Sequence, residues 1–220
     1  MKKSILFLLI SILGISISAE AQTYDFKSLI NENTIYFKVK NVKERKVEIV
    51  SEIPTSPYYE SNTTRPVGNL ILPDTIIDNG IMYFINSIGD YAFSNCTEIT
   101  SVTIPSLVVS IGKGAFQNCI SLDSVFFNAE NCKHFGEEKF LAFEGCNNIS
   151  KLIIGDNVKR IPAFSFAGIS SLKTIMANPI TPPKIKGTTF KGVSKHIDVY
   201  IYYSAQEGYK EDYFWKEFNN

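Results

Sequence analysis

Apolar residues recur along the second half of the chain in a phrase of fixed internal spacing. In the clearest copies a phenylalanine is followed by apolar residues or cysteine three, six, nine and eleven positions later. The five anchors, 23, 27, 23 and 24 residues apart, are Phe93, Phe116, Phe143, Phe166 and Phe190. Self-similarity at such a period indicates supersecondary units that bury their apolar faces only against one another.

The end of each phrase predicts a short strand. A Leu-x-x-Val-x-Ile core at this period is typical of leucine-rich architectures. We therefore predict a repeat solenoid, a leucine-rich repeat β-solenoid of about five 23–27-residue units over residues 85–202. The periodicity predicts the architecture of the repeat array but gives little information about a catalytic or binding function.

The two ends of the repeat array need covering, because a terminal repeat would otherwise expose its interior. Residues 22–84 alternate like strands and predict an N-terminal β-hairpin cap, with Ile35, Phe37 and Val39 on one face. Residues 203–220 predict a short C-terminal cap helix, whose start has the capping-box pattern of Ser204 and Glu207. Its aromatic residues could instead bind a ligand.

Two repeats depart from the pattern. In the third, Phe135-Gly136 replaces Ile-Gly and three extra residues precede Phe143, which predicts a local bulge. In the fifth, His196 stands where leucine is expected. Gly89, Gly112 and Gly136 fit a tight turn, because glycine accepts backbone conformations that other residues resist.

The strand register yields a candidate binding surface. Because side chains alternate between the faces of a strand, residues next to the inward valines and leucines point outward. One such column is apolar in four of its five members and contains Phe126, Ile153, Met176 and Tyr200 after Thr103. With strands about 4.8 Å apart, these four would form a strip roughly 15 Å long. Either the strip binds a partner, or β-propensity accounts for it and a loop covers it.

Residues 1–21 read as a secretory signal peptide: two lysines, an apolar run over 5–17, and Ala19-Glu20-Ala21 before Gln22. The apolar run is shorter than the about 20 residues of a membrane span, so cleavage is favoured over anchoring. We expect a secreted or cell-surface protein, with the periplasm as a further location, and no membrane span after cleavage.

The charge of the chain argues against one class of partner. Without residues 1–21 the net charge is near −1 and no basic block occurs, so nucleic acid is not an expected partner. Cys96, Cys119 and Cys146 share one register position, which favours a column of buried thiols over structural disulfides. Cys132 lies outside it and is the thiol expected to be reactive or paired. No metal site, cofactor or catalytic constellation is predicted, since the chain has only two histidines and no C-x-x-C pair.

The phrase Ile-Gly-x-x-Ala-Phe-x-x-Cys-x-x-Leu-x-x-Val-x-Ile-Pro, clearest at residues 88–105, resembles the repeats of the BspA-like leucine-rich repeat family of exported bacterial proteins. The resemblance extends to the terminal segments. It implies surface adhesion or protein binding without shared catalytic residues, an associational inference.

We therefore expect an exported non-enzymatic binding module whose partner is an extracellular protein or surface glycan. The alternative is a structural or self-associating cell-envelope protein, in which the partner is a second copy of the chain.

Overall fold

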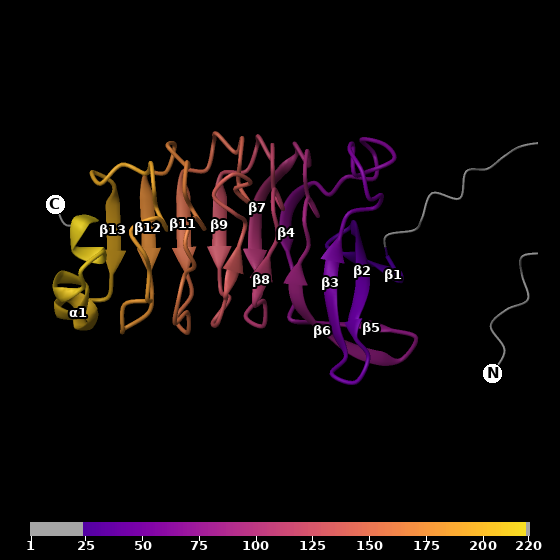
Figure 1. The fold of residues 1–220 in the computed structure, drawn as a ribbon, viewed down its shortest axis with the longest axis horizontal. Coiled ribbons are helices and arrows are strands. Elements are labelled where there is room, and N and C mark those ends of the chain that lie inside the picture. Colours follow the sequence, from indigo (N-terminus) through magenta and orange to yellow (C-terminus); the bar gives the residue numbers. More distant parts are fainter. Residues whose placement is uncertain (1–23, 219–220) are drawn as a thin grey trace, which may run out of the picture.

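The computed structural model describes residues 24–218, and the predicted signal peptide lies outside them. The chain forms the predicted β-solenoid (Figure 1). One wall is a six-stranded parallel sheet in which equivalent residues of successive repeats pair, as Val102 does with Val125 and Leu152 with Ile175. Its strands are β4 (Gly68–Ile71), β7 (Ile99–Ile104), β9 (Ser124–Phe127), β11 (Lys151–Ile154), β12 (Thr174–Ala177) and β13 (Asp198–Ile201).

A second wall alternates with the first along the chain. It consists of β6 (Ile81–Ile88), β8 (Ser110–Ile111) and β10 (His134–Phe135), which pair in parallel at Ile88, Ile111 and Phe135. These are the Ile-Gly positions of the repeat phrase, at which the sequence predicted only a tight turn. Short parallel strands form there instead, because each buried apolar side chain packs on its equivalent in the preceding repeat.

The N-terminal segment extends the second wall. β1 (Phe26–Ile30), β2 (Asn33–Asn41) and β3 (Lys46–Val50) are antiparallel, and β2 with β3 forms the predicted hairpin. β3 then pairs in parallel with β6, and β5 (Thr75–Asp78) adds to β6 as a second hairpin. β4, although it lies within residues 22–84, joins the repeat sheet by pairing with β7. The hairpin segment thus continues directly into the solenoid.

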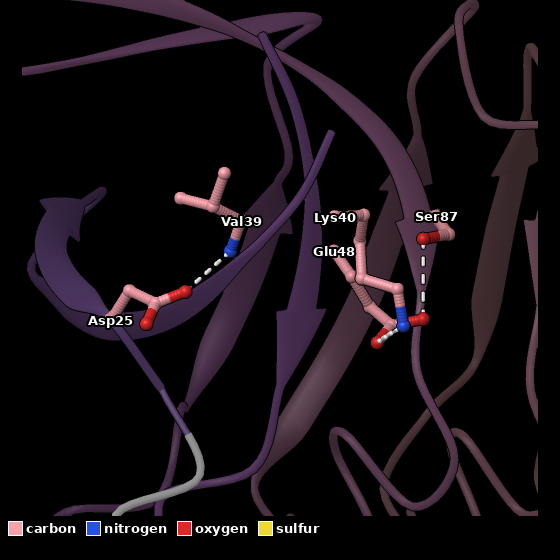
Figure 2. A network of polar contacts seen from close by, with 5 residues as sticks. All are labelled: Asp25, Val39, Lys40, Glu48 and Ser87. Atoms are coloured by element: carbon pink, nitrogen blue, oxygen red, sulfur yellow. Dashed lines mark hydrogen bonds and ion pairs between the residues drawn. The ribbon is translucent and has the colours of Figure 1, made fainter. Parts of the chain in front are cut away.

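Polar contacts tie this segment to itself and to the first coil. Asp25 accepts a 2.7 Å hydrogen bond from the backbone N–H of Val39, which fixes the entry to β1 (Figure 2). Glu48 accepts from Lys40 at 2.9 Å on β2 and from Ser87 at 3.3 Å on β6. A carboxylate on the central strand β3 therefore links the strands on either side of it.

The core between the walls is built from columns of identical or similar side chains. The five anchor phenylalanines stack with ring centroids 5.2, 5.2, 6.0 and 5.6 Å apart and interplanar angles of 14° to 20°. Beside them the thiols of Cys119 and Cys146 donate to the carbonyls of Phe93 and Phe116, at 3.2 and 2.9 Å. Ring stacking thus joins all five coils, and a thiol hydrogen bond adds to it between the first and second coils and between the second and third.

All four cysteines are free and buried. This confirms the buried column. The expectation for Cys132 is wrong, because its thiol is buried and donates to the carbonyl of His134 at 3.2 Å. Burial raises the pKa of both Cys96 and Cys132 to about 12, which keeps these thiols protonated and unreactive.

The tight turn of each coil lies two residues after the phenylalanine. That position has a positive φ in all five repeats, and it is occupied by Asn95, Asn118, Gly145, Gly168 and Gly192. Asparagine and glycine are the residues that adopt this conformation at least cost. The proposed reason for Gly89 and Gly112 is wrong: a Cβ on Gly112 would lie 2.5 Å from the backbone N of Asp90, so close coil contact demands glycine there.

The C-terminal segment covers the last coil (Figure 1). It comprises η1 (Tyr203–Ala205), α1 (Gln206–Glu211) and η2 (Trp215–Phe218). Trp215 packs at 5.8 Å on Phe190 and donates its indole N–H to the carbonyl of Pro183 at 2.9 Å. The predicted capping box is absent, because the 3-10 turn places Ser204 inside η1 and no side chain caps α1.

Both irregular repeats have local explanations. The extra residues of the third repeat form a small turn closed by an antiparallel bridge between Glu137 and Phe140, as the predicted bulge requires. In the fifth, His196 is exposed and Ile197 occupies the core, so the expected core position of His196 is wrong by one residue. None of the helices within residues 24–218 is long and apolar enough to cross a membrane.

Candidate interaction surface

The apolar column predicted from the register lies on the outer face of the six-stranded sheet. Ile153 pairs directly with Phe126 on one side and Met176 on the other, and Met176 pairs with Tyr200. Phe126 is 37% exposed and Tyr200 is 58% exposed, whereas Ile153 and Met176 are half-buried between their neighbours. We call these four residues the outer strip. Their inward neighbours on β9, β11 and β12 are buried, so the alternation is real.

A polar column runs beside the outer strip and is held in place by hydrogen bonds. Asp123 accepts from the hydroxyls of Ser150 at 2.5 Å and Ser124 at 2.8 Å. These bonds, with Lys151 and Lys173 nearby, hold the pKa of Asp123 below its usual value. The edge of the outer strip is therefore a preordered, ionised network.

A hollow of about 420 Å³ opens where the outer strip meets this column. Its lining combines the side chains of Met176 and Tyr200 with Lys151, Lys173 and Thr174. An aromatic ring and a thioether supply apolar contact area, and the two ammonium groups can pair with an acid or donate hydrogen bonds to the hydroxyl oxygens of a sugar. The hollow thus offers apolar contact and hydrogen bonding within one surface.

Sequence reasoning named the outer strip but missed its cationic edge. Lys151 is the first residue of β11 and lies two positions before Ile153, while Lys173 lies one residue before β12 and received no role. The signal that could have found it is the equivalent position in neighbouring repeats, where Asp123 and Ser150 occur. Tyr202, 51% exposed and two residues after Tyr200, also extends the aromatic surface.

The histidines do not form a common site with the outer strip. His134 belongs to β10 in the second wall, and His196 precedes β13 on an exposed loop. Within the described residues, no group of three or more histidines, cysteines or acids could hold a metal ion.

Comparison with known families matches the chain to the BspA type leucine rich repeat region, with six copies over residues 72–197. This chain belongs to the BspA type leucine-rich repeat family. The six copies span more than half of the sequence, and the first begins at Leu72, directly after β4. Leucine-rich repeat solenoids of this kind are interaction scaffolds. No curated protein is significantly similar in sequence.

Solved structures that match this chain include several bacterial leucine-rich repeat proteins. One from Bacteroides capillosus is 20% identical with a TM-score of 0.41, covering 80% of this chain and 98% of its own. One from Bacteroides ovatus is 24% identical with a TM-score of 0.43, and the match covers 81% of this chain and 37% of that protein. A leucine rich cell surface protein from Faecalibacterium prausnitzii is 20% identical, TM-score 0.41, covering 79% and 54%.

Proposed function

We propose that this protein is an exported, non-enzymatic binding module that uses the outer strip to attach to an extracellular protein or surface glycan. The observation that carries the proposal is the register of Phe126, Ile153, Met176 and Tyr200, which makes one continuous apolar surface from four repeats. Contiguous exposed apolar patches are rare on soluble monomeric proteins, and where they occur they often mark interaction sites.

The composition of this surface fits recognition better than simple hydrophobic adhesion. Tyrosine is enriched among the residues that dominate binding energy at interfaces, and Tyr200 and Tyr202 both lie exposed at its C-terminal end. Lys151 and Lys173 place positive charge at the rim, where it fixes orientation and accelerates association. A partner with a small apolar or sugar face and an adjoining acidic group would match.

The surface is small, which sets the expected strength of binding. Stable complexes bury about 800 Å² per partner, more than four side chains supply. Binding through the outer strip would therefore be weak for one molecule and strong for an array of molecules at a surface.

The test is a binding screen of the purified protein against immobilised extracellular-matrix proteins and glycans. The double variant Phe126→Glu, Ile153→Glu should lose saturable binding because it places two charges in the apolar contact. Leu29→Glu, Val42→Glu is the matched control, since both are exposed apolar residues of the N-terminal segment outside the outer strip. Equal binding by the double variant and the native protein would reject the outer strip as the site.

Self-association in the cell envelope is the second candidate, and a separate feature favours it. The β5–β6 hairpin projects from the N-terminal end of the solenoid (Figure 1) and exposes Ile77 and Met82, which face one another across the ladder. Sedimentation velocity over a range of concentrations tests this role. Oligomers that disappear in Ile77→Glu would favour the structural role, and a monomer at every concentration would exclude it.

A further inference from the structure

A groove of about 580 Å³ lies in the second wall, apart from the outer strip. Its walls come from three successive repeats: β10 and the turn after it, the segment from Arg160 to Phe164, and the segment from Lys184 to Lys186. This volume is within the range of about 300 to 1,000 Å³ that ligand sites occupy. Buried Phe135 and Ile161 and half-buried Phe164 and Ile185 give it an apolar lining.

The irregular third repeat creates this groove. β10 pairs with β8 and is the last strand of its sheet within the described residues. The next ladder position is an isolated parallel bridge between Arg160 and Lys184, with Ile161 donating to the Lys184 carbonyl and Lys184 to the Lys159 carbonyl, both at 3.0 Å. The wall is thus interrupted between β10 and Arg160, beside the inserted turn that Glu137 and Phe140 close.

Positive charge collects along this interruption. Lys133, Arg160, Lys184 and Lys186 line the groove and are all exposed. None of these four forms an ion pair with any residue in the range 24–218. The two acids in the lining are already paired with lysines outside it, Glu137 with Lys113 and Glu138 with Lys191, each at 3.2 Å.

This arrangement is unusual for a chain whose formal net charge is zero. Four unpaired cations around one groove create a local positive potential that attracts anions and raises their local concentration. Arg160 and Lys184 are neighbours across a parallel bridge, so their charges repeat along the solenoid axis at about the 4.8 Å spacing of strands. The matching ligand carries negative charges in a row.

We propose that this groove binds a linear anionic polysaccharide, with the sugar rings lying against Phe164 and Ile185 and the acidic groups facing Arg160, Lys184 and Lys186. An acidic polysaccharide combines apolar ring faces with regularly spaced charges, as the apolar floor and cationic rim require. Nucleic acid fits less well, because proteins that bind it usually carry a strongly basic face and high overall positive charge. The site is independent of the outer strip.

The test measures binding of the purified protein to heparin, polygalacturonate and neutral dextran by isothermal titration calorimetry at about 50 and about 200 mM salt. Heparin and polygalacturonate separate recognition of sulfate from recognition of carboxylate. We expect binding to at least one of these, none to dextran, and weaker binding at the higher salt concentration. A single-stranded oligonucleotide of equal charge that binds more tightly than both would overturn the polysaccharide assignment.

The variant Arg160→Gln, Lys184→Gln should bind at least about tenfold more weakly and with a shallower salt dependence, since two of four cations are removed. Lys43→Gln, Lys210→Gln is the matched control, because it removes two exposed cations elsewhere and should change affinity less than about twofold. Arg160→Lys, Lys184→Arg should restore most of the binding. Equal loss in the control, or no binding of any acidic polysaccharide by the native protein, would overturn the proposal.

These outcomes are distinct from those of the outer strip. A protein that loses matrix or glycan capture in Phe126→Glu, Ile153→Glu yet keeps heparin or polygalacturonate binding has two sites. Retention of acidic-polysaccharide binding in Arg160→Gln, Lys184→Gln would place that binding elsewhere and reject the groove.

Discussion

Adjacent residues of one strand differ completely in role. On β9, Val125 and Phe127 are fully buried, while Phe126 between them is 37% exposed. The inward column repeats one kind of residue, as in Val102, Val125 and Ile175, because each side chain packs on its own equivalent. The outward column changes from threonine to phenylalanine, isoleucine, methionine and tyrosine. A position at which similar residues recur in every repeat is therefore a core position, whereas a position at which the residues differ lies on the surface and can vary with function.

The largest effect should come from the inward face. Phe143→Ala removes a buried ring that lies 5.2 Å from Phe116, 5.8 Å from Phe135 and 6.0 Å from Phe166. The cavity should cost about 3–5 kcal/mol of unfolding free energy. Urea denaturation followed by circular dichroism measures this loss, and a loss below about 1 kcal/mol would contradict the packing role of the column.

A smaller loss is expected at the coil turns. Asn118 has φ of +58° and donates its side-chain amide to Asn95 at 3.0 Å. Asn118→Ala should cost about 1–2 kcal/mol because alanine resists the left-handed conformation. Asn118→Gly is the control: it keeps the conformation and loses only the side-chain bond, so it should be the less damaging variant in the same denaturation assay.

The cysteine column should contribute about 1 kcal/mol per residue. Cys119→Ala removes a buried thiol and its 3.2 Å hydrogen bond to the Phe93 carbonyl, which costs about 1 kcal/mol. Cys119→Ser keeps a hydrogen-bond donor but replaces sulfur by the smaller oxygen, so it tests whether the hydrogen bond or the packing of the sulfur atom contributes the stability. Equal stability of all three proteins would show that the column is not structural.

Alkaline titration probes the same thiols without mutation. Burial raises the pKa of Cys96 to about 12 from the ordinary 9.0. The folded protein therefore holds its proton more tightly than the unfolded chain does, so stability is fully present below pH 9 and falls as pH rises toward 12. At pH 8 a thiol reagent should label all four cysteines only at the rate of unfolding, and immediate labelling of Cys132 would contradict its burial.

The features that recur in every repeat could be predicted from the sequence. The anchor phenylalanines, the cysteine column and the inward face of each strand follow from spacing, since one packing solution recurs in every coil. The outer strip followed as well, because alternation fixes which residues are outward once the inward set is known. Two strands of the second wall, β8 and β10, were missed, since two residues each, such as Ser110 and Ile111, are too short to show alternation.

Features that depend on contacts between coils could not be read from spacing. Arg160 and Lys184 lie 24 positions apart in the sequence yet are bridge partners, so no basic block marks the groove. Cys132 seemed irregular because it lies outside the phenylalanine-anchored phrase, although it is buried three residues before Phe135, as Val108 is before Ile111. The shift from His196 to Ile197 follows from polarity, because burying the apolar isoleucine is favourable whereas burying an imidazole is costly.

The smallest effect on stability should come from the outward face. Glutamates at Phe126 and Ile153 would point from the sheet into water, so Phe126→Glu, Ile153→Glu should change unfolding free energy by no more than about 0.5 kcal/mol per site. Val125→Glu on the same strand is the comparison, because a buried charge there should prevent folding. If the outer-strip variant also unfolds, these side chains stabilise the sheet, and their loss of binding could no longer be assigned to a surface contact.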